Sequence, residues 1–259
     1  MEGIEKTDYA GIATIFFQDG YNLARQKTVR GTGRKAVLQI MQTAYESIDG
    51  LLDSFCRRCE REKLKVDCRK GCSWCCHQAV LASPHEILSI CNYLDKSVEK
   101  NTLERIRERA AGKHSATREM SAMKFLHYLH PCPFLEKGSC LIYPVRPMAC
   151  RCYISSSVTS CREQYDNPED RTKIAALYDF PLKAGRGMNE GICSALMEKG
   201  LIPSEWLLET FIAAVFEHEK ILDAWLSGET PFGIRKLSAE ETRYLREYYD
   251  KLGSPETES

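Results

Sequence analysis

Nine of the cysteines in this chain form two groups within residues 68–161. The first group is Cys68, Cys72, Cys75 and Cys76, and the second is Cys132, Cys140, Cys150, Cys152 and Cys161. Thiolates are soft anionic ligands, and zinc and the iron of iron-sulfur clusters are the metals that suit clustered thiolates. Closely spaced ligands can curl around one site, while distant ligands tie separate parts of the chain to it. The spacing therefore predicts a metal centre whose ligands come from these nine residues.

A secreted disulfide framework is the first alternative to a metal centre, because 13 cysteines in 259 residues is high usage. Three features argue against it. The cysteine count is odd, residues 1–17 lack the basic and apolar regions of a signal peptide, and the chain is long enough to bury a core without covalent links. No apolar run is long enough to cross a bilayer. We therefore expect a cytoplasmic protein with no membrane span.

The charge composition offers little to a nucleic acid, because 36 basic residues balance 36 acidic ones. A basic run over residues 25–35 is best explained as a solvated approach to a helix. Its Gly31-Thr32-Gly33 stretch lacks the spacing of a phosphate-binding loop. We expect no nucleic-acid partner, and an unknown protein or small-molecule substrate is the partner class left open.

Helical periodicity dominates both flanks of the cysteine region. Apolar residues at spacings of three and four predict a long helix over residues 34–63, and Ser83, Pro84 and Glu86 form a helix start with a capping box. Further helices are predicted over residues 103–111, 120–129, 171–178, 188–199, 204–226 and 238–251.

Five prolines and glycines interrupt the segment from residue 131 to residue 165, where only residues 140–143 look strand-like. Metal binding could order such a loop-rich segment, because its free energy then contributes to folding. The expected class is mainly α, with helical flanks around a small, irregular, loop-rich cysteine and metal core. The expected parts are a helical segment 1–66, a metal-binding core 67–165 and a helical segment 166–259, joined in one compact domain.

The ordered cysteine blocks resemble the YkgJ-type cysteine-cluster family, described as a zinc- or iron-chelating domain with a CxxxCxxCC motif. The blocks that carry the resemblance are Cys68-Arg-Lys-Gly-Cys72-Ser-Trp-Cys75-Cys76, Cys132-Pro-Phe-Leu135 and Cys140-Leu-Ile-Tyr-Pro-Val-Arg146-Pro-Met-Ala-Cys150-Arg151-Cys-Tyr153. The resemblance implies Cys68, Cys72, Cys75, Cys76, Cys132, Cys140 and Cys150 as ligands, whereas Cys152 and Cys161 lie outside the matched pattern. Some relatives look like iron-sulfur-dependent lysine N-methylases, but nothing in the segments that flank the cysteines indicates a protein lysine as the substrate of this chain.

The excess of thiolates favours an iron-sulfur cluster of the [4Fe-4S] type over one structural zinc ion. The rival hypothesis is a binding or scaffold protein with one or two closed zinc sites and no catalysis. A third hypothesis comes from Cys68-x3-Cys72-x2-Cys75, the spacing with which radical S-adenosylmethionine enzymes hold a cluster. Against it, that fold alternates strands with helices, and helical patterning dominates here. The sequence leaves open whether the protein is an enzyme, and names S-adenosylmethionine only as a further candidate cofactor.

Two arginines that lie among the cysteines of the second group are candidate cofactor-binding residues. Arg146 and Arg151 could donate hydrogen bonds to anionic sulfur or bind an anionic substrate, or each could pair with a carboxylate that fixes the loop. Other cysteines have simpler explanations: Cys56, Cys59, Cys91 and Cys193 are better explained by helix packing than by ligation, and His77 is a lesser candidate ligand.

Overall fold

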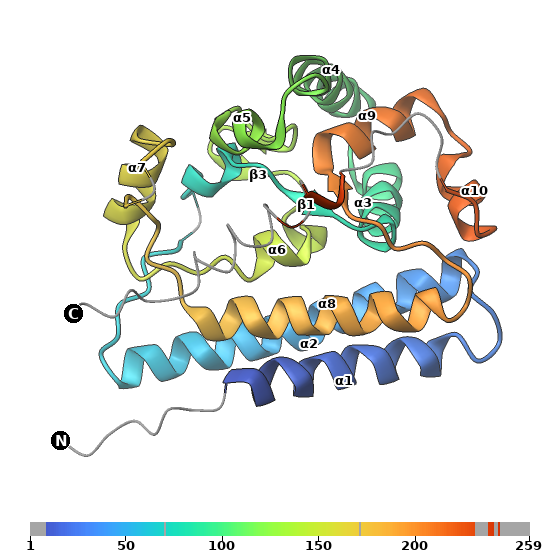
Figure 1. Cartoon of the computed structure of the whole chain (residues 1–259), viewed down its shortest axis with the longest axis horizontal. Helices are drawn as coiled ribbons and strands as arrows, with labels where there is room; N and C mark the ends of the chain where they lie inside the picture. The colour runs from blue at the N-terminus through green and yellow to red at the C-terminus, as the bar shows by residue number, and fades with distance from the viewer. Residues whose placement is uncertain (1–8, 70, 171, 231–237, 241–242, 244–259) are drawn as a thin grey trace.

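Three long helices lie side by side as one layer of the molecule (Figure 1). They are α1 (Tyr9–Lys27), α2 (Arg34–Arg61) and α8 (Asp179–Met197). The computed structural model describes residues 9–69, 71–170, 172–230, 238–240 and 243. The predicted helix over residues 34–63 is confirmed, and its apolar stripe from Val37 to Leu52 is buried in the core.

Glycines let α1 and α8 approach at backbone distance. A Cβ atom on Gly191 would lie 2.0 Å from the carbonyl oxygen of Phe17, and one on Gly20 would lie 2.1 Å from that of Met188. No side chain fits at such a distance, so the contact between the two helices depends on these positions having none.

The remaining helices cover the other side of this layer (Figure 1). They are α3 (Pro84–Ser97), α4 (Lys100–Thr117), α5 (Ala122–His127), α6 (Met148–Arg151), α7 (Val158–Asp166), α9 (Leu208–Glu217) and α10 (Ile221–Leu226). The predicted start of α3 is confirmed, since Ser83 and Glu86 form a capping box in which the Ser83 N–H donates to Glu86 Oε2 at 2.8 Å. The fold is mainly α, as the sequence predicted.

Strands in the described residues are short and occur as two antiparallel pairs. β1 (Leu81–Ala82) pairs with β4 (Trp206–Leu207), and β2 (Leu135–Glu136) pairs with β3 (Ser139–Cys140). Two 3-10 turns, η1 (Trp74–His77) and η2 (Tyr143–Val145), complete the middle of the chain. In this part of the chain the predicted loop-rich character is confirmed.

Two of the predicted helices differ from the structure. Residues 172–178 are not helical, because Leu177 pairs with Ser155 as an isolated bridge and the Tyr178 N–H donates to the carbonyl of Ile154 at 2.9 Å. The helix predicted over 204–226 is divided into β4, α9 and α10. Its first part pairs with β1, and α9 ends at Glu217 with His218 as its C-cap. Most of the helix predicted over 238–251 lies outside the described residues. No helix in the described ranges is long and apolar enough to span a membrane.

Candidate metal centre

The first cysteine group meets the second through two backbone hydrogen bonds. The N–H of Cys132 donates to the carbonyl of Cys76 at 2.8 Å, and the N–H of His130 donates to the carbonyl of His77 at 3.1 Å. These bonds fix η1 against the segment that leads into Cys132. Two cysteines far apart in the sequence thus become neighbours through the main chain.

A tight hairpin brings Cys140 back to the same place. Lys137 and Gly138 occupy its two turn positions with φ of 49° and 74°, and Leu135 then pairs with Cys140. Positive φ at both positions is typical of the type I′ turn, whose twist suits a two-residue hairpin. Because β2 follows Cys132 by only three residues, the turn places Cys140 beside the Cys132 segment.

The fourth cysteine of this neighbourhood, Cys150, lies on α6. The helix is anchored to α3, because the Met148 N–H donates to Glu86 Oε1 at 2.7 Å. Burial raises the pKa of the Cys150 thiol well above its usual value, and the nearby thiols of Cys132, Cys76 and Cys140 raise it further. We refer to Cys76, Cys132, Cys140 and Cys150 as the first thiol group. It is defined by proximity in space and differs from the first cysteine group of the sequence.

Backbone donors already point at two sulfurs of this group. The N–H of Phe134 donates to the Cys132 sulfur and that of Ile142 donates to the Cys140 sulfur, and each bond lowers the pKa of its thiol. Burial acts in the opposite direction and is stronger, raising the pKa of Cys132 to about 12. Such donors stabilise a thiolate, which is the form that binds a metal.

Cys75 and Cys76 interact directly through their side chains. The sequence argument that adjacent residues on a helix face apart does not apply, because η1 is a single 3-10 turn. A hydrogen bond between the two sulfurs lowers the pKa of Cys76 to about 7 and raises that of Cys75. Cys75 is also near enough to Cys150 and Cys68 for their charges to raise its pKa, so it lies between the first thiol group and the remaining cysteines.

A second thiol group consists of Cys68, Cys72 and Cys161, and it is organised around Ser155. The Ser155 N–H donates to Cys68 Sγ at 3.1 Å, and the Ser155 hydroxyl is near enough to Cys161 to lower the pKa of that thiol. The charge of Cys72 raises the pKa of Cys68 and that of Cys161. Burial is the largest cause of the raised pKa at Cys68 and at Cys161.

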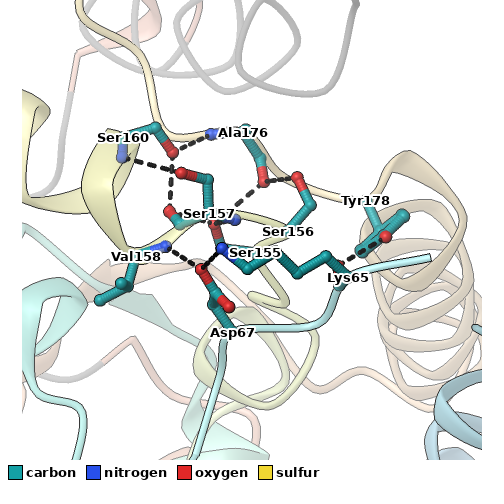
Figure 2. Close-up of polar contacts among 9 residues, drawn as sticks. All are labelled: Lys65, Asp67, Ser155, Ser156, Ser157, Val158, Ser160, Ala176 and Tyr178. Atoms are coloured by element: carbon teal, nitrogen blue, oxygen red, sulfur yellow. Dashed lines mark hydrogen bonds and ion pairs between the residues drawn. The ribbon is translucent and has the colours of Figure 1, made fainter. Parts of the chain in front are cut away.

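Figure 2 shows the polar network that holds this second group in place. Asp67 lies at one edge of it, where its N–H donates to the Ser155 carbonyl at 3.0 Å and its carboxylate accepts from the Val158 N–H at 2.8 Å. The Ala176 carbonyl accepts from Ser156 N–H and from the Ser155 hydroxyl, at 2.9 and 3.0 Å. The network joins the chain just before Cys68 to the start of α7, which carries Cys161.

Cys152 is placed apart from both groups. It is buried against α8, where a Cβ on Gly185 would lie 2.2 Å from its sulfur, and no other cysteine is among the causes of its raised pKa. Its assignment as a ligand stays a prediction.

Arg151 is buried, and its guanidinium is engaged within the fold. It pairs with Asp49 of α2, donates to the Pro144 carbonyl at 2.7 Å and lies 4.1 Å over the Tyr45 ring. This is the carboxylate partner that the sequence analysis left open. Arg146 instead lies nearer the surface, with its guanidinium 3.8 Å over the exposed Tyr143 ring and close enough to Cys140 to lower the pKa of that thiol. Cofactor binding by either residue stays a prediction.

The cysteines outside the two groups differ in their surroundings. Cys91 and Cys193 lie on α3 and α8, where burial raises the pKa of Cys91 to about 12 and raises that of Cys193 strongly. Cys59 is buried at the end of α2, whereas Cys56 is near enough to Cys68 to raise its pKa. The Trp74 ring packs 5.1 Å from that of Tyr165, which covers η1.

The donor atoms suit zinc or iron, but their positions do not yet enclose an ion. Within the residues that the structure describes, no three histidine, cysteine or acidic side chains converge closely enough to hold a metal. All thirteen cysteines are free thiols, including those with N–H donors at sulfur. The donor set therefore fits a thiolate-bound metal, and binding would draw the thiols of a group together.

Residues 67–176 match a family model named CxxCxxCC, described as "Putative zinc- or iron-chelating domain". This segment, 110 of the 259 residues, is similar to that family, and we refer to it as the CxxCxxCC domain. The match extends past Cys161, where the resemblance noted from the sequence ends, to Ala176, whose carbonyl accepts from the Ser155 hydroxyl. Neither the comparison with curated proteins nor that with solved structures gives a match. The CxxCxxCC domain thus holds all nine predicted ligands, and metal binding is the function that its family description supports.

Two groups of residues near the cysteines were not predicted from the sequence. Ser155 contacts two cysteines but lies in a run of serines that carries no local signal. Lys113 and Glu209 form a buried ion pair near Cys132, although each sits in an ordinary helical pattern far from the cysteines in the sequence. Their positions follow only from the packing of α4 against α9.

Proposed function

We propose that the CxxCxxCC domain carries an iron-sulfur cluster of the four-iron type, held by the first thiol group: Cys76, Cys132, Cys140 and Cys150. One observation carries the proposal. Main-chain hydrogen bonds and the β2–β3 hairpin bring three thiols close to Cys150 on α6. The thiols of Cys76, Cys132 and Cys140 each raise the pKa of Cys150. Four thiolates match a cubane cluster that takes one thiolate on each iron.

The protein's own groups prepare these sulfurs for ligation. The N–H donors of Phe134 and Ile142 favour the ionised thiols, and the N–H of Cys132 fixes the distance to the Cys76 backbone. Metal binding would relieve the cost of burying these sulfurs, because ligation deprotonates them and disperses their charge. A bound cluster would supply one-electron chemistry.

The second thiol group and Cys75 supply further candidate ligands beyond the first four. Cys68, Cys72 and Cys75 could instead hold a cluster by three irons, which is the arrangement that S-adenosylmethionine-dependent radical chemistry requires. The helical fold weighs against this alternative, since the described strands are only two residues long. Adding S-adenosylmethionine to the reduced protein and assaying for 5′-deoxyadenosine tests it directly.

A closed zinc site is the alternative from a different functional class. Four thiolates also satisfy tetrahedral zinc, and such a site would order the loop without turnover. Anaerobically purified protein separates the two proposals. An iron-sulfur protein is brown, absorbs in the visible and releases iron and sulfide in equal amounts, whereas colourless protein with stoichiometric zinc would replace the iron proposal.

The assignment of ligands is tested by a matched pair of variants. Cys150→Ser is expected to lose the metal of the first thiol group, because its sulfur is one of the four ligands. Cys91→Ser is the control, since Cys91 is a half-buried thiol on α3 away from both groups. Full metal content in folded Cys150→Ser protein would refute the ligand set.

A further inference from the structure

A buried ion pair connects α4, within the CxxCxxCC domain, to α9, which lies outside it in the sequence. Lys113 Nζ lies 3.7 Å from Glu209 Oε2, and the two side chains are 3% and 1% exposed. Burying both charges is costly, and apolar residues of similar volume often stabilise a fold at least as well. The packing of the two helices therefore gives no reason for a lysine at this position.

Lys113 is also joined to the backbone that carries Cys132. Its ammonium donates to the carbonyl of His130 at 3.3 Å, and the His130 N–H donates in turn to the carbonyl of His77. His130 precedes Cys132 by two residues, and His77 follows Cys76 by one. The ammonium thus contacts the backbone that links two members of the first thiol group.

The charge of Lys113 is felt at the Cys132 sulfur. The two groups are close enough for a direct charge interaction. The other titratable groups that act on Glu209 are His114, whose Nδ1 lies 3.1 Å from Thr210 Oγ1, and His130.

Glu209 is only partly satisfied. Its Oε2 faces Lys113, but among the residues that the structure describes its buried Oε1 has no hydrogen-bond partner. A carboxylate placed in this way pulls the ammonium toward α9 and cancels part of its charge. How much positive charge reaches the sulfurs therefore depends on both residues.

We infer that Lys113 is a positioning residue that balances the negative charge of the thiolate-bound metal, and that Glu209 limits this effect by pairing with it. The inference rests on the proposed function, because it needs a metal on the first thiol group. Four thiolates leave such a centre anionic in a region of low dielectric, so a buried cation stabilises it and favours its reduced, more negative form.

Substitutions of Lys113 and of Glu209 are expected to shift the midpoint potential in opposite directions. Lys113→Met removes the cation while keeping the length of the side chain, so the midpoint potential of the cluster falls and iron is released to a chelator faster. Glu209→Gln removes the anion that offsets the cation, so at pH 8 the potential rises and release is slower. Lys113→Arg keeps the charge and is expected to restore the behaviour of the unchanged protein. A purely structural role would move both variants in the same direction.

Potential and chelator release are measured on the full-length, metal-loaded protein, with Arg34→Met as the control. Arg34 pairs with Asp223 at 2.8 Å on the surface and is expected to leave both readouts unchanged. If Lys113→Met does not fold, the rise in potential for Glu209→Gln carries the test. Unchanged or same-direction shifts for the two partners overturn the inference.

The failure of the iron proposal is distinguishable from the failure of this inference. If the protein holds zinc and no iron, the four-iron cluster is refuted, and the rate of zinc transfer to a colorimetric chelator becomes the readout. Faster transfer from Lys113→Met and slower transfer from Glu209→Gln would then support the role of the pair. Equal rates would refute it.

Discussion

The backbone N–H of Cys132 donates a 2.8 Å hydrogen bond to the carbonyl oxygen of Cys76. This bond joins the two cysteine groups of the sequence through the main chain, before any metal is bound. It also sets the direction in which the β2–β3 hairpin leaves the site, because β2 begins only three residues after Cys132. The geometry of the hairpin therefore matters for the metal centre as well as for the fold.

The hairpin turn requires a glycine at one of its two positions. Gly138 has φ of 74°, where a side chain costs about 1–2 kcal/mol, so Gly138→Ala is expected to lower the melting temperature and weaken metal retention together. Lys137→Asn should have the opposite effect on stability, because asparagine tolerates positive φ better than lysine at this turn position. Thermal unfolding with metal analysis checks both. A Gly138→Ala variant as stable as the unchanged protein would contradict the turn geometry.

The hydroxyl of Ser155 is expected to contribute to stability through the network of Figure 2. It is buried, donates to the carbonyl of Ala176 at 3.0 Å and accepts from the Ser157 N–H at 3.1 Å. Ser155→Ala leaves that N–H without its partner and should cost about 1–3 kcal/mol in the free energy of unfolding. Metal content should persist in folded protein, because the bond to Cys68 comes from the backbone.

Ser156 provides the matched control for this measurement. Its hydroxyl bonds the same carbonyl at 3.2 Å but is exposed to solvent, so Ser156→Ala should change stability by less than about 0.5 kcal/mol. Urea unfolding of both variants compares them directly. Equal losses would show that the network contributes through exposed contacts instead.

Close contact between α1 and α8 predicts a large effect at Gly191. A Cβ there would lie 2.0 Å from the Phe17 carbonyl oxygen, so Gly191→Ala must force the helices apart, at a cost of about 3 kcal/mol or more. Gly112→Ala, within α4, meets nothing within 4 Å and should gain about 0.5–1 kcal/mol from helix propensity. Melting temperatures that move in the same direction for both variants would contradict the packing of α1 on α8.

His85 predicts a dependence of stability on pH. Burial lowers its pKa to about 4, from an ordinary value of 6.5, although a hydrogen bond with Asn189 at 2.9 Å opposes the shift. The unfolded chain then binds a proton that the folded chain does not, so stability is retained above pH 6.5 and is lost as pH falls toward 4. The loss approaches about 3 kcal/mol at the lower end.

The measurement compares the unchanged protein with His85→Gln from about pH 7 to about pH 4. Glu86 acts with the opposite sign over an overlapping range, because burial raises its pKa to about 7, and the difference between the two proteins removes its contribution. The variant is expected to lose less stability on acidification. Parallel curves would show that His85 is not held neutral by the fold.

Local sequence patterns predicted several of the helices correctly. The stripe of α2 and the capping box at Ser83 arise from contacts within a few residues, so periodicity and residue type are sufficient to indicate them. The cysteine spacing likewise indicated a metal-binding segment before its partners in space were known. The same local reasoning was wrong for residues 172–178, where pairing with Ser155 outweighs helical propensity.

What the sequence by itself determined was the chemistry available: soft anionic donors, two short arcs of them, and helices on either side. Only the tertiary structure decided which donors are neighbours, because the contacts of Cys76 with Cys132, of Ser155 with Cys68 and Cys161, and of Lys113 with Glu209 join segments distant in the chain. Such contacts follow from the packing of whole elements, and no local periodicity of the chain records them.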